Sequence, residues 1–188
     1  FVADGYGVER FDVMYNDFIL VGPPADPAGI AGMKDAPAAL KKIAESEAVF
    51  ASRGDNSGTH KKEMALWTDA GVEPTAASGQ WYRETGSGMG ATLNAAVGMS
   101  AYTMTDRGTY IKYESNLKGN PPLKILVEGD AVLLNQYSVI AIDTKHCSKA
   151  DYENAKRFIG WIAGPEAQQL IKDFKLLNKQ LFTPNAQK

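Results

Sequence analysis

The chain lacks several features that would place it in large classes of protein. Its 188 residues include a single cysteine, Cys147, so no disulfide can form within the chain. The net charge of −2 leaves no broad basic field, which argues against nucleic acid as a partner. No apolar run approaches the roughly 18–20 residues of a membrane span. The two histidines, His60 and His146, have no further ligands at metal-binding spacing, so we expect neither a metal nor a cofactor.

A secretory leader is missing too, but this absence says little about the compartment. The sequence opens on Phe1 rather than Met, and residues 1–7 read like the end of a helix. We therefore expect that a portion of the protein precedes Phe1, and a leader would have stood there.

The hydrophobic residues, 44% of the chain, are enough for a sizeable core. Strand-like runs alternate with helical segments, which is typical of an α/β fold. The patterns predict strands at 11–21, 47–52, 100–104, 123–127 and 137–142, and helices at 38–46, 60–70, around 93–97, 105–113, 149–163 and 166–177.

Two of these strands are candidates for crossings between two lobes, namely the strand ending at Val21 and the strand Tyr137–Ile142. We expect them to lie side by side, with residues 23–137 forming lobe 2 and residues 1–22 and 138–188 forming a discontinuous lobe 1. Two full lobes need about 200–300 residues, so lobe 1 would be incomplete. Its uncovered apolar face would then favour a dimer or need an additional segment.

The first chemically informative stretch runs from Ala51 to Glu63. It leaves a strand, turns through Gly54 and Gly58, and enters a helix with hydroxyl residues at its start. Helix N-termini present backbone N–H groups and the positive end of the helix dipole, which suit an anion. Arg53 adds a charged fork of donors that fits tetrahedral oxyanions. The simpler interpretation is that Ser57 or Thr59 only caps the helix while Arg53 pairs with Asp55.

The second stretch runs from Glu84 to Leu93 and again opens a helix with exposed amides. Its glycines let backbone approach a ligand closely, and the two helix starts could face each other across a cleft. Gly86, Gly88 and Ala91 also satisfy the loose dinucleotide pattern. That pattern needs a preceding buried strand, and residues 80–83 do not read as one. A nucleotide-dependent enzyme using Gly86–Ala91 therefore stays an alternative, without a visible acid, base or cofactor.

With both motifs, the chain resembles the tungstate-binding proteins of bacterial ABC importers. Members carry Ser-Arg-Gly-Asp-(Asp/Asn)-Ser-Gly-Thr-His and Glu-Thr-Gly-x-Gly-Met-Gly, which match residues 52–60 and 84–90 here. The likeness extends through residues 15–18, 101–110 and 135–140, so it covers essentially the whole chain. The family's N-terminal Thr-Thr-Thr-Ser motif has no counterpart in the sequence, which agrees with a missing N-terminal portion.

The resemblance implies a type II periplasmic-binding-protein fold, in which two lobes close on the ligand. It also implies an extracytoplasmic or periplasmic location and a membrane permease as partner. The protein would capture tungstate or molybdate and would not be an enzyme, since its motifs hold donors and no nucleophile with a base. The expected ligand-binding residues are Ser52, Arg53, Ser57, Gly58, Thr59, Thr85, Gly86, Ser87, Gly88 and Met89.

Phosphate is the nearest alternative ligand, because phosphate-binding proteins of the same fold use a similar Asp-x-Ser-Gly-Thr loop. Monohydrogen phosphate carries a proton and needs an acceptor, a role that Asp55 could fill. Tungstate has no proton at neutral pH, and for tungstate we expect Asp55 to stay off the ligand, bound to backbone or to Arg53.

Overall fold

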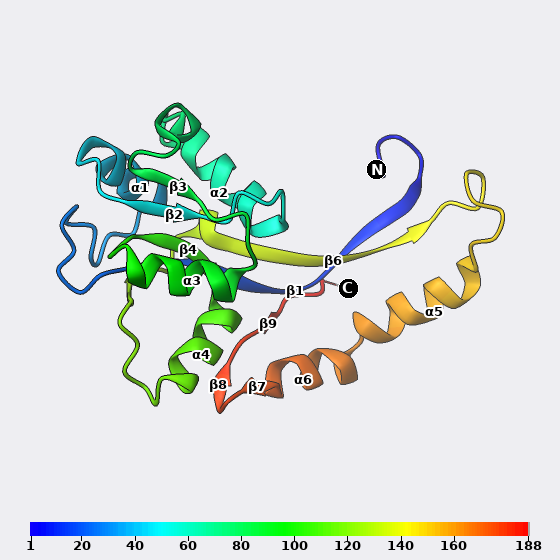
Figure 1. Ribbon diagram of the computed structural model, residues 1–188. Coiled ribbons are helices and arrows are strands. Elements are labelled where there is room, and N and C mark those ends of the chain that lie inside the picture. Colours follow the sequence, from blue (N-terminus) through cyan, green and yellow to red (C-terminus); the bar gives the residue numbers. More distant parts are fainter. Residues whose placement is uncertain (188) are drawn as a thin grey trace. The chain divides into compact units, whose positions relative to one another are not determined.

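The computed structural model describes residues 1–187 (Figure 1). The chain forms two compact units: unit 1 comprises Phe1–Asn16 and the residues from Asn135 onward, and unit 2 comprises Asp17–Leu134. The unit boundaries fall inside two strands, β1 (Gly7–Gly22) and β6 (Leu134–Ile142). These strands pair with each other, which confirms that the early and the late predicted strand lie side by side.

Unit 2 is an α/β domain with a twisted sheet. In one sheet β1 pairs in antiparallel with β4 and with β5, in the order β4–β1–β5. β2 and β3 form a separate parallel pair, and a bridge from Phe50 of β2 to Tyr102, just before β4, links this pair to the larger sheet. The elements of unit 2 after β1 are α1 (Ala36–Glu45), β2 (Phe50–Ser52), α2 (Gly58–Asp69), the 3-10 turn η1 (Pro74–Ala77), β3 (Tyr82–Glu84), α3 (Met89–Gly98), β4 (Thr103–Asp106), α4 (Arg107–Asn116), β5 (Lys124–Val127) and the 3-10 turn η2 (Ala131–Leu133).

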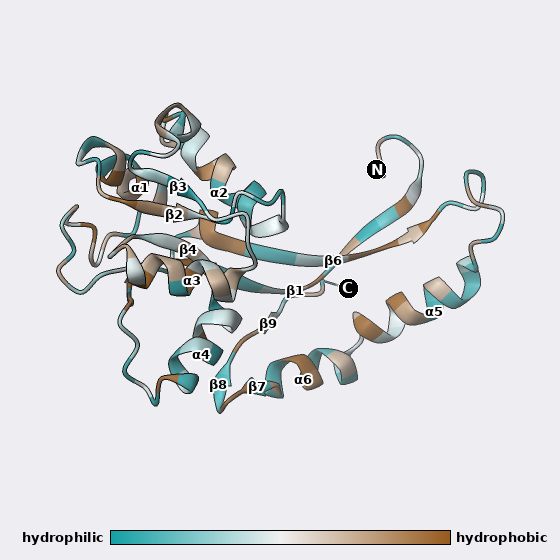
Figure 2. Cartoon of the chain, viewed as in Figure 1, coloured by the Kyte–Doolittle hydropathy of each residue, from teal (hydrophilic) through white to brown (hydrophobic). Residues whose placement is uncertain are grey.

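Both faces of this sheet are buried. Side chains of β1 alternate between two core clusters: Phe18 and Leu20 belong to the first, and Ile19 and Val21 to the second. Helices α1 and α2 cover the first face, and α3 and α4 cover the second. Figure 2 shows the hydrophobic strand residues between these helices. A strand apolar on both sides needs this double cover, which keeps the ends of β2 and β3 in fixed positions.

Unit 1 has a smaller core. Its remaining elements are β6, α5 (Tyr152–Ile162), α6 (Pro165–Asp173), the short hairpin β7 (Lys175–Leu176) and β8 (Lys179–Gln180), and β9 (Thr183–Pro184), which pairs with β1. Ile159 and Ala167 are buried, whereas Phe158, Trp161 and Leu170 are about half exposed. Figure 2 shows brown, hydrophobic segments along α5 and α6. Within residues 1–187, no helix is both long and apolar enough to cross a membrane.

All six predicted helices and five predicted strands occur, with different ends, whereas the short strands β3, β7, β8 and β9 were not predicted. The helix predicted to Leu177 stops at Asp173, because Leu177 and Asn178 take positive φ angles and turn the β7–β8 hairpin. The helix predicted from Thr105 begins two residues later, because Asp106 ends β4 and caps α4. Residues 80–83, which do not read as a buried strand, contain the first two residues of the short strand β3, and Tyr82 is the one fully buried residue of that strand.

Candidate functional site

The two sequence motifs lie next to each other at one edge of the unit 2 sheet (Figure 1). β2 and β3 run parallel, with Ser52 opposite Glu84. The backbone N–H of Thr85 donates to the carbonyl of Ser52 at 2.9 Å. Because parallel strands end at the same edge, the loops that follow them are neighbours. The two helix starts therefore follow neighbouring strand ends of the same unit.

The first loop, residues 53–57, is held by an ion pair between Arg53 and Asp55. Nε and Nη2 of Arg53 donate to Oδ2 of Asp55 at 3.1 and 2.5 Å. The other oxygen of Asp55 accepts the backbone N–H of Ser57 at 3.2 Å. Hydrogen bonding by the Ser57 side chain, with Arg53 adding to it, lowers the pKa of Asp55 to about 2. The carboxylate is therefore ionised at neutral pH and already occupied.

Free donors remain around this loop. Two of the five guanidinium N–H groups of Arg53 go to Asp55, which leaves the other three for a ligand. Ser57 caps α2 by accepting the N–H of His60 at 3.3 Å. The amides of Gly58 and Thr59 and the Thr59 hydroxyl donate to no atom of the described chain. They point from the positive end of the α2 dipole.

The second helix start is more open. Gly88 occupies the N-cap position of α3 and has no side chain to satisfy the first amides. Among residues 1–187, no acceptor receives the backbone N–H groups of residues 86–91. Gly86, Gly88 and Gly90 are exposed, so this run of amides is accessible. A helix without a cap leaves its donors for solvent or for an anion.

Hydroxyl groups fix the second loop from behind. The Thr85 hydroxyl donates to the Ser52 carbonyl at 3.1 Å and lies 2.8 Å from the Thr92 hydroxyl. Ser87 donates to the Thr85 carbonyl at 3.1 Å. Because Thr85, Ser87 and Thr92 bond within the loop, the loop can offer a ligand its amides with little reorganisation. Thr92 lies inside α3, where no sequence pattern singled it out.

Two of the expected ligand residues have buried side chains. Ser52 is fully buried, and its hydroxyl accepts the Gly54 N–H and donates to Glu63. Met89 packs in the second core cluster, so it offers only its backbone. Sequence reasoning also missed Glu63, which lies behind the first loop. A charged residue at a buried helix position was the signal available.

The unpaired groups of this site are hydrogen-bond donors. His60 does not activate Ser57, because Nδ1 of His60 accepts the Asn56 N–H at 3.1 Å and the Ser57 oxygen accepts from the His60 backbone. Its exposed groups are donors: amides, a hydroxyl and a guanidinium. Such a set stabilises a multivalent anion and supplies no poised general base.

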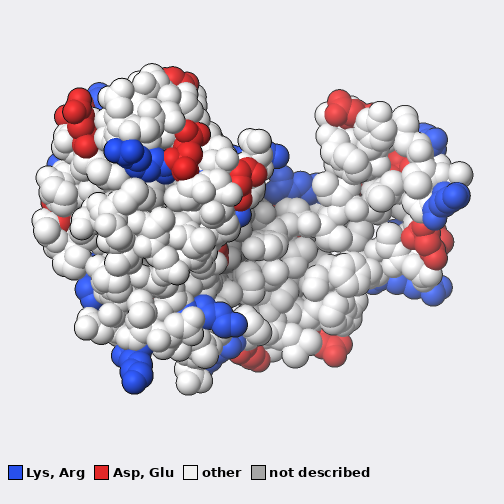
Figure 3. Space-filling model, in the orientation of Figure 1, with Lys and Arg blue, Asp and Glu red and all other residues white. Residues whose placement is uncertain are grey.

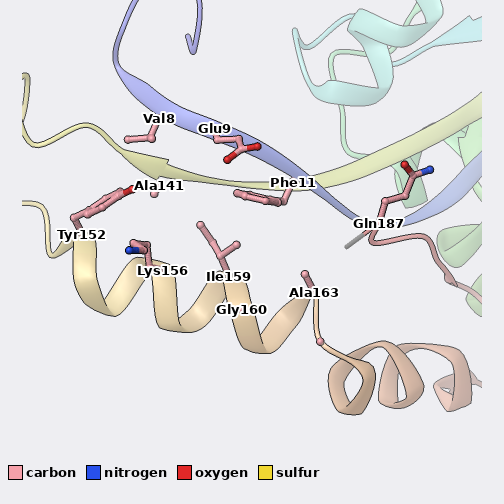
Figure 4. A pocket seen from close by; sticks show the side chains of 11 residues that line it. Val8, Glu9, Phe11, Ala141, Tyr152, Lys156, Ile159, Gly160, Ala163 and Gln187 are labelled. Carbon is pink, nitrogen blue, oxygen red and sulfur yellow. The ribbon is translucent and has the colours of Figure 1, made fainter.

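A separate hollow in unit 1 is apolar. It has a volume of about 360 Å³ and lies between the strands β1 and β6 and helix α5. Figure 4 shows Phe11 and Ile159 pointing into this space. With few donors in its lining, it does not suit a small oxyanion. Within residues 1–187 there is no group of three or more His, Cys, Asp or Glu side chains that could hold a metal. Positive and negative side chains are interspersed on the face in Figure 3.

Comparison with known proteins agrees with this architecture. A family model described as a PBP superfamily domain matches residues 1–166. The tungstate-binding protein TupA of Campylobacter jejuni is 45% identical over 99% of this chain and 68% of its own length. TupA of Peptoclostridium acidaminophilum is 48% identical over 100% of this chain and 65% of its own. The solved TupA from Desulfovibrio alaskensis G20 has 55% identity and a TM-score of 0.90, covering 100% of this chain and 74% of that one.

The chain belongs to the PBP superfamily and, within it, to the family of the tungstate-binding proteins TupA. This confirms the family and the α/β binding-protein fold that the motifs predicted. The chain spans between 54% and 68% of the length of the curated relatives that it matches.

Proposed function

We propose that this chain binds a tetrahedral dianion, tungstate or molybdate, at the loops 53–59 and 85–89 and delivers it to an ABC importer. The observation that carries the proposal is the pair of neighbouring helix starts, whose amides have no acceptor in the described chain, beside the free N–H groups of Arg53. Each hydrogen bond to a charged group contributes roughly 1.5–3 kcal/mol. Five or six of them approach the ~12 kcal/mol of a nanomolar dissociation constant once ordering and desolvation are subtracted.

The state of Asp55 favours tungstate over phosphate. Tungstate has no proton at neutral pH and is satisfied by donors alone, whereas monohydrogen phosphate needs one acceptor. The carboxylate of the first loop is bound to Arg53 and to the Ser57 amide, so it is not directed at a ligand. The ligand named for the TupA relatives points the same way.

In this proposal, Arg53, Thr59 and the amides of residues 58–59 and 86–89 form the ligand shell. Ser52, Ser57 and Thr85, whose own donors bond within the protein, support it from behind. The protein acts outside the cytoplasmic membrane, its partner is the importer's membrane permease, and it catalyses no reaction. Phe158, Trp161 and Leu170 of unit 1 would be covered in a dimer, which size measurement in solution tests directly.

Competition calorimetry with tungstate, molybdate, sulfate and phosphate tests the ligand. Tungstate and molybdate should bind with similar affinity, and sulfate and phosphate at least about 100-fold more weakly, a difference of roughly 2.8 kcal/mol. Equal competition by phosphate, or no binding of any of the four, would overturn the proposal.

A further inference from the structure

Glu63 is a buried carboxyl placed directly behind the candidate site. It lies on α2 and is 2% exposed. Its oxygens accept three hydrogen bonds: from the Ser52 hydroxyl at 2.9 Å, from Nε1 of Trp67 at 3.2 Å and from the Tyr82 hydroxyl at 2.7 Å. These partners lie on β2, α2 and β3. The Glu63 carboxyl therefore connects β2 and β3, the strands that precede the two loops, to helix α2.

The contact with Ser52 reaches the first loop. Ser52 Oγ donates to Glu63 and accepts the N–H of Gly54 at 3.2 Å. Gly54 has a φ of +60° and forms the turn between Arg53 and Asp55. Glu63 therefore fixes the orientation of the Ser52 hydroxyl, and through it the backbone from which the site donors project.

The charge of Glu63 is not compensated. In the part of the chain that the structure describes, no Lys, Arg or His forms an ion pair with it. Burial raises the pKa of Glu63 to about 7, against hydrogen bonds that lower it, and Glu84 on β3 raises it further. Tyr82, the other titratable group against it, stays neutral because burial and Glu63 raise its pKa far above the ordinary value.

We propose that Glu63 is a positioning residue of the oxyanion site, which fixes the first loop through Ser52 and takes up a proton from solvent when the dianion binds. The inference rests on the proposed function. Glu63 follows Gly58 by five residues, about 7.5 Å along the helix axis. At a separation of about 8 Å, repulsion between a dianion and an ionised carboxylate weakens the binding of the dianion by roughly fivefold, even in the dielectric of water and before salt screening.

Protonation removes this repulsion and keeps the contacts. A protonated Oε2 can donate to Ser52 Oγ, which has two lone pairs and still accepts from Gly54. The other oxygen still accepts from Trp67 and Tyr82. The neutral side chain therefore holds the loop as the ionised one does, without repelling the ligand. Affinity should then rise as the pH falls through the titration range of Glu63.

The test is tungstate calorimetry on the full chain at low, fixed ionic strength between pH 6 and 9, in buffers of different ionisation enthalpy. Such pairs of buffers report the number of protons taken up on binding. The variants are E63Q, which keeps the size and removes the charge, and S52A, which breaks the link to Gly54. Y110F is the matched control, because it deletes a buried hydroxyl bond (2.8 Å to the Leu123 carbonyl) elsewhere in unit 2.

The wild type should bind with proton uptake, and its dissociation constant should rise about fivefold or more from pH 6 to 9. E63Q should bind at pH 9 about as tightly as the wild type at pH 6, without this uptake. S52A should bind at least about tenfold more weakly while still taking up the proton. Y110F should lose stability and keep the wild-type affinity and uptake.

Two results would overturn the inference while the proposed function stands. The first is tight tungstate binding by the wild type with no dependence on pH. The second is proton uptake that persists in full in E63Q, which would assign the proton to another group. If the wild type binds no tungstate at all, the proposed function fails and the inference falls with it.

Discussion

Replacing Arg53 by alanine is the most direct perturbation of the proposed site. The Arg53 side chain is 20% exposed, and the three N–H groups that it does not give to Asp55 are free for the ligand. Each charge-assisted bond contributes roughly 1.5–3 kcal/mol, less where water can replace it. The substitution also leaves the Asp55 carboxylate uncompensated beside a dianion. We therefore expect R53A to weaken tungstate binding by about 2–5 kcal/mol, roughly 30-fold to several thousand-fold.

The assay is calorimetry at fixed salt, with two companions. R53K keeps the charge but loses the planar fork, so its affinity should lie between wild type and R53A. In R53A/D55N the uncompensated carboxylate is gone, so the double variant should bind more tightly than R53A.

The chain supplies a matched control with the same spacing. Arg10 and Asp12 form an exposed ion pair at 3.3 Å, with side chains 54% and 46% exposed. R10A should leave tungstate affinity unchanged and alter stability by at most about 1 kcal/mol. Equal affinities of R53A and wild type would remove Arg53 from the ligand shell and refute the reasoning.

Three further predictions concern stability. G54A should lower the free energy of unfolding by about 1–3 kcal/mol, because φ is +60° at Gly54 and an added Cβ would lie 2.9 Å from Glu84 Cβ. G98A is the control: an added Cβ there meets open space, so this variant should be neutral or slightly stabilising. Thermal melts compare the two variants. The pKa of Asp55 falls from 3.8 to about 2 on folding, so its contribution to the free energy of unfolding should be complete above pH 4 and disappear as the pH falls through 2. A stability difference between wild type and D55N that does not shrink in acid would contradict this prediction. For Glu63 the pH dependence of stability has the opposite sign, because its folded pKa of about 7 lies above the ordinary 4.5. Its contribution to stability, on the order of 3 kcal/mol, is present below pH 4.5 and is lost as the pH rises through 7. Urea titrations of E63Q should lack this pH dependence.

The sequence by itself determined the family, the α/β class and the two loops. Motif residues such as Arg53, Ser57 and Gly88 act locally: a hydroxyl caps the nearest helix, a glycine leaves its helix uncapped, and an arginine reaches an aspartate two residues away. Such short-range interactions depend on residues that are neighbours in the chain, so the amino-acid sequence alone can predict them. The β1 core alternation was readable for the same reason, because its apolar run is long enough to show a strand.

Only the tertiary structure decided how the two loops meet. β3 has three residues and one buried side chain, too few to show a period, and it becomes a strand because β2 offers it a parallel partner. That pairing sets Ser52 beside Thr85 and makes one site of two motifs more than 30 residues apart. It also buries Glu63 against Tyr82, a contact between residues 19 apart in the chain. Parallel pairing and burial arise between segments distant in the chain, and their energies depend on the folded neighbours rather than on local sequence.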